Sequence, residues 1–313
     1  MRNSRSYVLV AGGCIALAAT AALAAVTVAC VTADTRPTPA TLTLTVSPSA
    51  AVDRGVMTAD GWSITFDRVV VAIGKAGLGE GCSIYGEADY DRILDVTHTA
   101  SQKLGILYGI GQCDVDFRIE APSADALLGT GVTDDDKTRL RTPGGDHYVP
   151  LGGIASEIGL AASRGTVTKH LRLSTRSTIR YKDCHLEPDS GVPALDLASN
   201  AVLTYDLRIE GEAILRDDVD VSAALRFDPF ANADTNGDGV VTLDELRAVP
   251  IGTVRDGGAF EAGTYQVNDA GKVERGAPIV IETLGDYVYQ VLAPSLVRFR
   301  DTGNCVPTER RED

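Results

Sequence analysis

Three segments of the sequence alternate strictly between apolar and polar residues, and this pattern limits the fold more than any other feature. They are 62–67 (WSITFD), 113–120 (CDVDFRIE) and 203–210 (LTYDLRIE). Successive side chains of a β-strand point to opposite faces, so each segment would turn one apolar face to a core and one charged face to water. The alternation predicts half-buried antiparallel strands.

Short apolar runs separated by Gly, Pro, Asp and Asn predict further strands. These runs are 41–47, 68–73, 92–96, 165–174, 177–182, 212–216, 263–267 and 278–283. Short helices are expected at 123–128, at 133–141 with Thr133 as N-cap, and at 284–293. Many strands and few helices predict a mainly β fold, with an antiparallel β-sandwich-like body and a few short helices. The least regular stretch is 129–164.

The composition is that of a folded globular protein, and its charge argues against one class of partner. The chain has 313 residues, of which 44% are hydrophobic and 23% charged. This length allows one to three domains. With 29 Lys and Arg against 43 Asp and Glu, the net charge is −14. An acidic surface repels phosphate groups, so we expect no nucleic-acid partner.

The N-terminal segment has the features of an export signal. Arg2 and Arg5 precede an uncharged, largely apolar stretch from Val8 to Cys30, which is typical of a secretory signal peptide over 1–29. The segment before Cys30 resembles a bacterial lipobox, which implies lipid attachment at this cysteine. A simple cut after the Ala22–Ala24 segment and an uncleaved membrane anchor are the alternatives. Lipidation would leave a flexible Pro- and Thr-rich tether within 30–45. With either lipidation or simple cleavage, we expect an extracytoplasmic location, in the bacterial cell envelope as an outer-membrane lipoprotein or in the periplasm, or secreted.

Four cysteines remain outside this segment, namely Cys82, Cys113, Cys184 and Cys305. An even number at wide spacing in an exported chain predicts two disulfides, with three possible pairings. No C-x-x-C pair is present, which argues against a structural zinc site.

One motif carries specific chemistry. Residues 234–245 read DTNGDGVVTLDE and fit the pattern D-x-[DN]-x-[DN]-G-x5-E at every constrained position. The segment resembles an EF-hand calcium loop. The resemblance implies Ca²⁺ as the bound ion, held by six residues: Asp234, Asn236, Asp238, Val240 through its carbonyl, Thr242 directly or through water, and Glu245.

The flanks of this loop differ from those of calcium sensors. Pro229 and Pro250 leave room for only a turn or two of helix on either side. The eighth loop residue, Val241, would pair with a second loop in an EF-hand pair, but the chain holds no second copy. A lone loop with short helices favours a structural role for calcium rather than a signalling one.

We therefore divide the chain into a signal over 1–29, the tether over 30–45, a β-rich domain over 46–227, the calcium loop over 228–250 and a C-terminal β-rich segment over 251–313. The expected function is that of an exported, calcium-binding surface or periplasmic protein, in which calcium stiffens a binding or architectural module. Its partner is an unknown protein or surface, and any membrane contact is made through the N-terminal anchor alone.

Two other classes of function stay open. The sequence has no G-x-S-x-G, H-E-x-x-H or P-loop motif, so an enzyme is disfavoured but not excluded. The strand-rich outline with few histidines and one tryptophan is also loosely similar to bacterial periplasmic copper-handling β-sandwiches. The histidines are His98, His147, His170 and His185.

Overall fold

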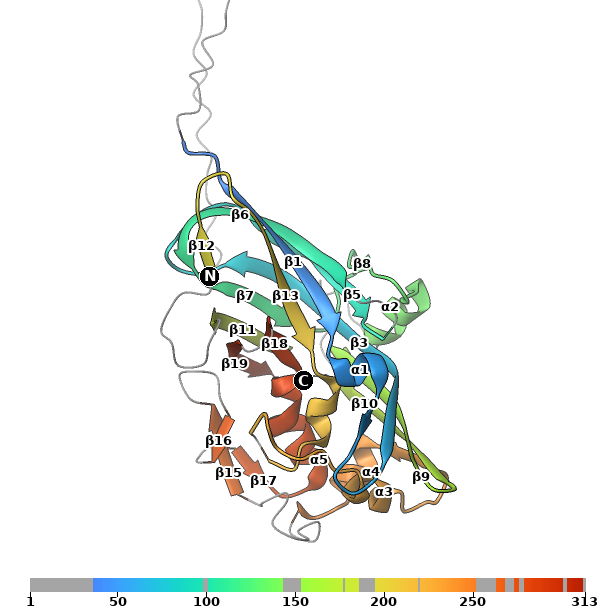
Figure 1. Ribbon diagram of the computed structural model, residues 1–313. Coiled ribbons are helices and arrows are strands. Elements are labelled where there is room, and N and C mark those ends of the chain that lie inside the picture. The colour runs from blue at the N-terminus through green and yellow to red at the C-terminus, as the bar shows by residue number, and fades with distance from the viewer. Residues whose placement is uncertain are drawn as a thin grey trace, which may run out of the picture. The chain divides into compact units, whose positions relative to one another are not determined.

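The computed structural model describes residues 36–97, 101–142, 153–176, 178–185, 195–218, 220–251, 263–267, 273–275, 279–300 and 303–311. The chain divides into two units, residues 1–36 and residues 37–313. Strands dominate the second unit, and most of them form two mixed sheets, as the alternating sequence pattern predicts (Figure 1).

The first sheet has six strands. Its order is β12 (Leu195–Leu197), β6 (Gln102–Cys113), β1 (Ala40–Pro48), β13 (Val202–Ile209) and β18 (Val297–Phe299), with β4 (Cys82–Gly86) also paired to β6. Strand β1 confirms the strand predicted at 41–47, and its Leu42 and Leu44 are fully buried in the core. The predicted end of the tether at residue 45 therefore overlaps this strand.

The second sheet has ten strands. Its main order is β14 (Val240–Thr242), β10 (Val167–Thr175), β9 (Ser156–Arg164), β3 (Ser63–Leu78), β7 (Val115–Ile119), β11 (Thr178–His185) and β19 (Asn304–Arg311). Strands β2 (Val56–Met57) and β5 (Ala88–Asp95) pair with β3, and β8 (Leu127–Leu128) pairs with β5. Three further strands, β16 (Val273–Arg275), β15 (Gly263–Val267) and β17 (Ile279–Ile281), form a small antiparallel sheet.

Helical segments are short. They are α1 (Ala50–Arg54), η1 (Gly211–Leu215), α2 (Asp134–Leu140), α3 (Asp228–Ala233), α4 (Leu243–Arg247), α5 (Leu284–Asp286), the π-helix η3 (Tyr287–Leu292) and η4 (Ala293–Leu296). Thr133 caps α2 with a capping box, as expected, and helical turns occupy the predicted 284–293 stretch. Two predictions were wrong. Residues 212–216 were expected as a strand but fall in η1 and the residue after it, and the helix expected at 123–128 is instead a turn followed by β8.

Strand β3 explains how the layers pack. Val69, Val71 and Ile73 lie in the main core with the inward residues of the first sheet. Val70 and Ala72 point the other way, into a second small core that includes Leu140 of α2. The run of apolar residues is continuous here because this strand is covered on both faces.

Two disulfides hold the sheets, as the four cysteines outside the signal predict. Cys82 is joined to Cys113, which links β4 to β6. Cys184 is joined to Cys305, which links β11 to β19. Disulfides persist in oxidising compartments, so the folded body belongs to an extracytoplasmic environment. No helix among the described residues is long and apolar enough to cross a membrane.

Candidate metal centre

The predicted calcium loop lies at the edge of the second sheet, between two short helices. Helix α3 ends at Ala233, the loop follows, and α4 begins at Leu243. Figure 1 shows α3 and α4 close to β9 and β10 at one end of that sheet. Both helices are as short as the flanking prolines predict, because Pro229 occupies the first turn of α3 and Pro250 follows α4.

Backbone amides inside the loop turn its acidic side chains inward. Asp234 accepts hydrogen bonds from the amides of Gly237 (2.8 Å) and Gly239 (2.9 Å). Asn236 Oδ1 accepts from the amide of Asp238 (2.8 Å), and Asp238 Oδ1 accepts from the amide of Val240 (2.7 Å). These contacts produce the tight, repeated turns that place alternate residues on one side of the loop.

The sixth loop position needs glycine. Gly239 has φ of +84°, and Gly237 has φ of +75°. L-residues with side chains rarely adopt such values. The motif requires glycine at the sixth position, and Gly239 has the positive φ that glycine adopts readily.

Asp234, the first loop position, is already paired with a positively charged side chain. Its side chain is fully buried and forms an ion pair with the ammonium group of Lys169 on β10, whose side chain is 21% exposed. The hydrogen bond from Lys169 lowers the pKa of Asp234, and the amides of Gly239 and Gly237 lower it further. The carboxylate is thus held ionised at a site where a cation is stabilised.

Glu245, the last loop position, has one occupied and one free oxygen. Its Oε2 accepts from the amide and the hydroxyl of Thr242, both at 2.9 Å, and completes a capping box on α4. Its Oε1 is buried and has no hydrogen-bond partner. A buried carboxylate oxygen without a partner is costly, and a bound cation would remove that cost.

The eighth loop position pairs with the body of the protein. Val241 is fully buried and lies in β14, where it is the register partner of Leu171 in β10. The amide of His170 also donates to the carbonyl of Gly239 (2.8 Å). Strand β10 therefore supports the loop at the position where a second loop would do so in an EF-hand pair.

The entry to the loop is anchored by an aromatic cluster. Trp62 packs edge-on against Phe227 at 5.2 Å between ring centroids, and its Nε1 donates to Asp228 (2.8 Å). Asp60 accepts from the amides of Phe227 (2.8 Å) and Asp228 (2.7 Å). Burial raises the pKa of Asp228, but the hydrogen bonds from Trp62 and Arg164 outweigh it and the net shift is downward.

The exit from the loop is anchored to the C-terminal segment. The amide of Ile251 donates to the carbonyl of Glu282 (2.9 Å), and the amide of Leu284 donates to Val249 (2.9 Å). Gly285 of α5 lies so close to Arg247 of α4 that an added Cβ would come within 2.8 Å of the Arg247 amide nitrogen. The two helix termini are therefore in close contact.

The residue types at the six loop positions are suitable calcium ligands, but their carboxylates do not lie close enough together to form a metal site in this structure. Oxygen donors occupy all six predicted positions, and Glu245 offers a buried free oxygen. Within the described residues, no three His, Cys, Asp or Glu side chains form a group that could hold a metal. Calcium would therefore have to draw Asp238 and Glu245 towards Asp234.

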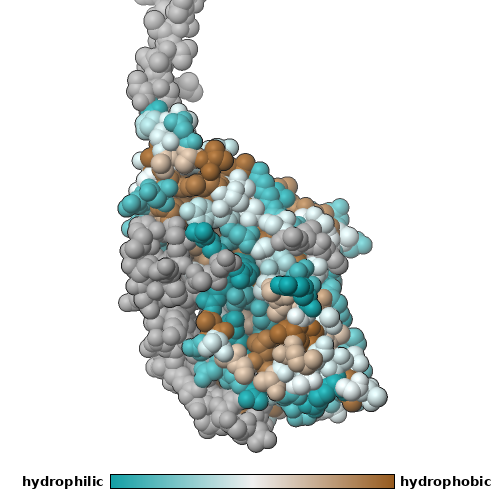
Figure 2. Space-filling view, in the orientation of Figure 1, coloured by the Kyte–Doolittle hydropathy of each residue, from teal (hydrophilic) through white to brown (hydrophobic). Residues whose placement is uncertain are grey.

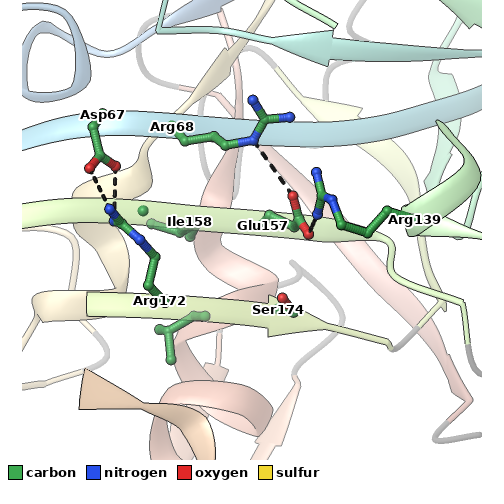
Figure 3. A pocket seen from close by; sticks show the side chains of 9 residues that line it. Asp67, Arg68, Arg139, Glu157, Ile158, Arg172 and Ser174 are labelled. Atoms are coloured by element: carbon green, nitrogen blue, oxygen red, sulfur yellow. Dashed lines mark hydrogen bonds and ion pairs between the residues drawn. The ribbon is translucent and has the colours of Figure 1, made fainter. Parts of the chain in front are cut away.

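A second polar site is a cleft of about 520 Å³ on the second sheet. Figure 3 shows Arg172 facing Asp67, and Glu157 between Arg68 and Arg139. Arg172 bonds both oxygens of Asp67, at 3.0 and 2.7 Å. The other two arginines share the carboxylate of Asp136, at 2.6 and 2.7 Å. No motif in the sequence marks this cleft, and its arginines are paired with carboxylates, which is typical of a structural network.

The described residues give no support to a copper site. His98 and His147 lie outside the described residues, and so do Cys30 and the rest of the export signal. The backbone of His185 is described, but its side chain is not. His170 has a buried Nδ1 without a partner, but it does not belong to any candidate metal group in the described part of the chain.

Two exposed apolar side chains lie on the first sheet, in the strands on either side of β1. Val202 is 80% exposed and Tyr108 39% exposed, and both are register partners of Thr41 at the start of β1. Figure 2 shows apolar surface at this end of the first sheet. Residues 235–238 of the loop are exposed and polar or glycine.

Comparisons of the chain with protein-family models, with curated proteins and with solved structures found no match.

Proposed function

We propose that this is an exported protein that binds one calcium ion in the loop 234–245, and that the ion acts as a structural clip. The ligands would be the side chains of Asp234, Asn236, Asp238, Thr242 and Glu245 and the carbonyl of Val240. The observation that carries the proposal is the buried, unpartnered Oε1 of Glu245 at the twelfth position of a loop that matches the motif throughout.

Three parts of the fold meet at this loop. Its first helix is held by Trp62 and Asp60 from the turn before β3. Its short strand pairs with β10, and its second helix contacts α5 of the C-terminal segment. An ion that fixes the loop would therefore stiffen the connection between these three parts, and the stabilisation would follow from mass action.

The second part of the proposal concerns location. Cleavage before Cys30 and lipid attachment to it would hold the body at a bacterial cell-envelope membrane through a Pro- and Thr-rich tether. There the body would act as a binding or architectural module towards a protein or surface partner. The disulfides support the oxidising compartment, and the anchor is tested by mass spectrometry of the mature N-terminus with a Cys30→Ala variant as control.

The calcium proposal is tested by calorimetric titration of the purified protein and of a Glu245→Gln variant. Glutamine preserves the capping box, because it can accept from the Thr242 amide as glutamate does. The variant therefore removes the charge without removing the helix cap. The matched control is Asp244→Asn, since Asp244 is adjacent in sequence, 92% exposed and outside the ligand positions.

We expect one-to-one binding by the wild type and by Asp244→Asn, and loss of binding by Glu245→Gln. For a dissociation constant of about 10⁻⁴ to 10⁻³ M, about 10 mM calcium would stabilise the fold by about 1.4 to 2.7 kcal/mol. Thermal unfolding in calcium and in chelator measures this gain. Absence of both heat and stabilisation in the wild type would rule out the calcium site.

A further inference from the structure

A further pocket, separate from the calcium loop and from the cleft on the second sheet, is lined by several charged side chains. It lies where β1 and β13, which run parallel, both end: Pro48 is the register partner of Ile209. The chain continues from β1 into α1 and from β13 into η1, and these two helical segments contact each other. Figure 1 shows α1 at the end of β1, close to the end of β13.

This pocket has a volume of about 500 Å³, which is within the range of small-molecule sites. Its charged walls are Arg54, Arg208, Glu210, Glu212 and Arg216. The remaining lining is small or apolar and comes from α1, β2 and residues 221–225.

Two buried arginines, Arg216 of the pocket wall and Arg298 of β18, share one carboxylate oxygen. Glu210 Oε2 lies 2.7 Å from Nη2 of Arg216 and 3.4 Å from Nε of Arg298. Arg216 is 5% exposed and Arg298 8% exposed. Arg298 is also the register partner of Arg208 across β13 and β18, so two like charges face each other on adjacent strands.

The second carboxylate nearby does not balance this cluster well. Glu212 accepts a hydrogen bond from the hydroxyl of Ser49 (2.6 Å). Burial raises the pKa of Glu212, and the neighbouring charge of Glu210 raises it further. Burial and the repulsion of Arg216 and Arg208 lower the pKa of Arg298. Both shifts indicate a crowded, weakly solvated cluster. Its positive excess follows from its residues, because Arg54, Arg208, Arg216 and Arg298 outnumber Glu210 and Glu212.

One buried donor in this cluster has no acceptor. Nη1 of Arg216 is buried and makes no hydrogen bond. An unpaired guanidinium donor in a buried position is costly, and an oxyanion is its natural partner because guanidinium geometry matches two oxygens of a carboxylate, phosphate or sulfate.

We propose that this pocket binds a small solute through one oxyanion group, held by Arg208 and Arg216, with the neutral part of the solute against α1 and residues 221–225. The positive charge is confined to the arginines of this pocket, since the chain as a whole carries a net charge of −14. Recognition would thus depend on these arginines rather than on attraction to the whole protein. The site is separate from the calcium loop and does not depend on it.

The test is calorimetric titration of the purified protein with sodium phosphate, at constant ionic strength and without calcium. Arg208→Gln removes one of the arginines in the pocket wall. Glu212→Gln removes negative charge, while its amide oxygen can still accept from Ser49. The control is Arg172→Gln, an arginine of similar chemistry paired with Asp67 in the other cleft.

We expect saturable one-to-one binding that Arg208→Gln weakens by about tenfold or more and that Glu212→Gln strengthens by about threefold, the scale of one charged hydrogen bond or one nearby charge. Arg172→Gln should bind as the wild type does. Sulfate and acetate, titrated in the same way, show which oxyanion geometry is preferred.

Two outcomes would overturn the proposal. One is no saturable binding of any of the three anions by a folded wild-type protein, in which case the arginines form a purely structural network. The other is equal affinity in Arg208→Gln, Glu212→Gln and Arg172→Gln, which would place the bound anion elsewhere. Circular dichroism of each variant establishes that it is folded before it is titrated.

Discussion

Lys169 is the residue that most directly affects the proposed calcium ion. Its ammonium group occupies one oxygen of Asp234, the first ligand position. Calcium cannot coordinate that oxygen fully while the ammonium group holds it, so binding has to displace or shift Lys169. The sequence motif contains no sign of this competition, because Lys169 lies 65 residues earlier in the chain.

Replacement of Lys169 by glutamine should therefore strengthen calcium binding. Loss of one competing charge from a partly exposed ion pair corresponds to about threefold to tenfold in the dissociation constant. Calorimetric titration measures it. Lys137→Gln is a matched control, because Lys137 is 22% exposed and pairs with Asp134 away from the loop. Unchanged or weaker binding in Lys169→Gln alone would show that the lysine supports the loop rather than competing with the ion.

Glu212 gives a prediction about pH. Burial, with Glu210 beside it, raises the pKa of this carboxyl in the folded protein. A raised folded pKa means that the folded state binds the proton more tightly than the unfolded state does. The resulting stabilisation is present at low pH and is lost as pH rises from the unfolded pKa through the folded pKa.

Glu212→Gln should consequently be more stable than the wild type above that window, by on the order of 1 kcal/mol, and similar to it below. Urea denaturation at about pH 4 and about pH 8 brackets the ordinary glutamate pKa. A variant that is less stable than the wild type at the higher pH would mean that the Ser49 hydrogen bond and the charge of Arg216 outweigh the burial of the carboxylate.

At the scale of elements, local pattern predicted strands well but not every boundary. Alternation at 62–67 and the apolar run at 68–73 were two predictions, yet both belong to the single strand β3. Strands β6 and β9 were not predicted, because the glycines and the polar residues of 102–113 interrupt any clear alternation and 129–164 is irregular in composition.

The segment 212–216 shows how tertiary contacts override a local pattern. Ala213, Ile214 and Leu215 are consecutive apolar residues, which favours a buried strand. They are all buried, but in the 3-10 helix η1. The amide of Glu210 pairs with the carbonyl of Leu296 from another part of the chain, and no sequence signal within 212–216 encodes that partner.

The contact between α4 and α5 yields a stability prediction. A Cβ at Gly285 would lie 2.6 Å from Cγ and 2.8 Å from the backbone nitrogen of Arg247. The backbone cannot move aside as a flexible side chain can, so Gly285→Ala should destabilise the protein by about 1 to 3 kcal/mol.

Denaturant unfolding measures the effect of Gly285→Ala, and Gly86→Ala is the control. The closest atom to a Cβ at Gly86 is Cδ2 of Tyr108 at 3.4 Å, an ordinary contact. If both variants unfold at the same denaturant concentration, the helix contact is looser than the distances indicate and the proposed clip would not connect firmly to the C-terminal segment.

At the scale of the whole molecule, the main difference from expectation is strand direction. An antiparallel body was predicted, and most pairs are antiparallel, but β1 pairs with β13 in parallel. Thr41 and Val202, which are partners at the start of this pair, are far apart in the chain. Alternation within a strand is the same for either direction, so strand order and direction cannot be read from it.

The disulfide pairing had also to come from the structure, because four cysteines at wide spacing allow three connectivities. The two bridges differ greatly in the length of chain they close. Cys82 and Cys113 are 31 residues apart, whereas Cys184 and Cys305 are 121 residues apart. The longer bridge encloses the calcium loop, and its second cysteine lies in the last strand, β19.

These separations predict unequal contributions to stability. In the chain-entropy model, closing the longer loop stabilises the fold by about 5 kcal/mol and closing the shorter one by about 4 kcal/mol. A double Cys184→Ala and Cys305→Ala variant should therefore lose about 1 kcal/mol more than the corresponding variant of Cys82 and Cys113. Equilibrium denaturation at one calcium concentration gives both values. A greater loss from the Cys82 and Cys113 variant would mean that attachment of β4 to the edge of the first sheet, rather than chain entropy, dominates.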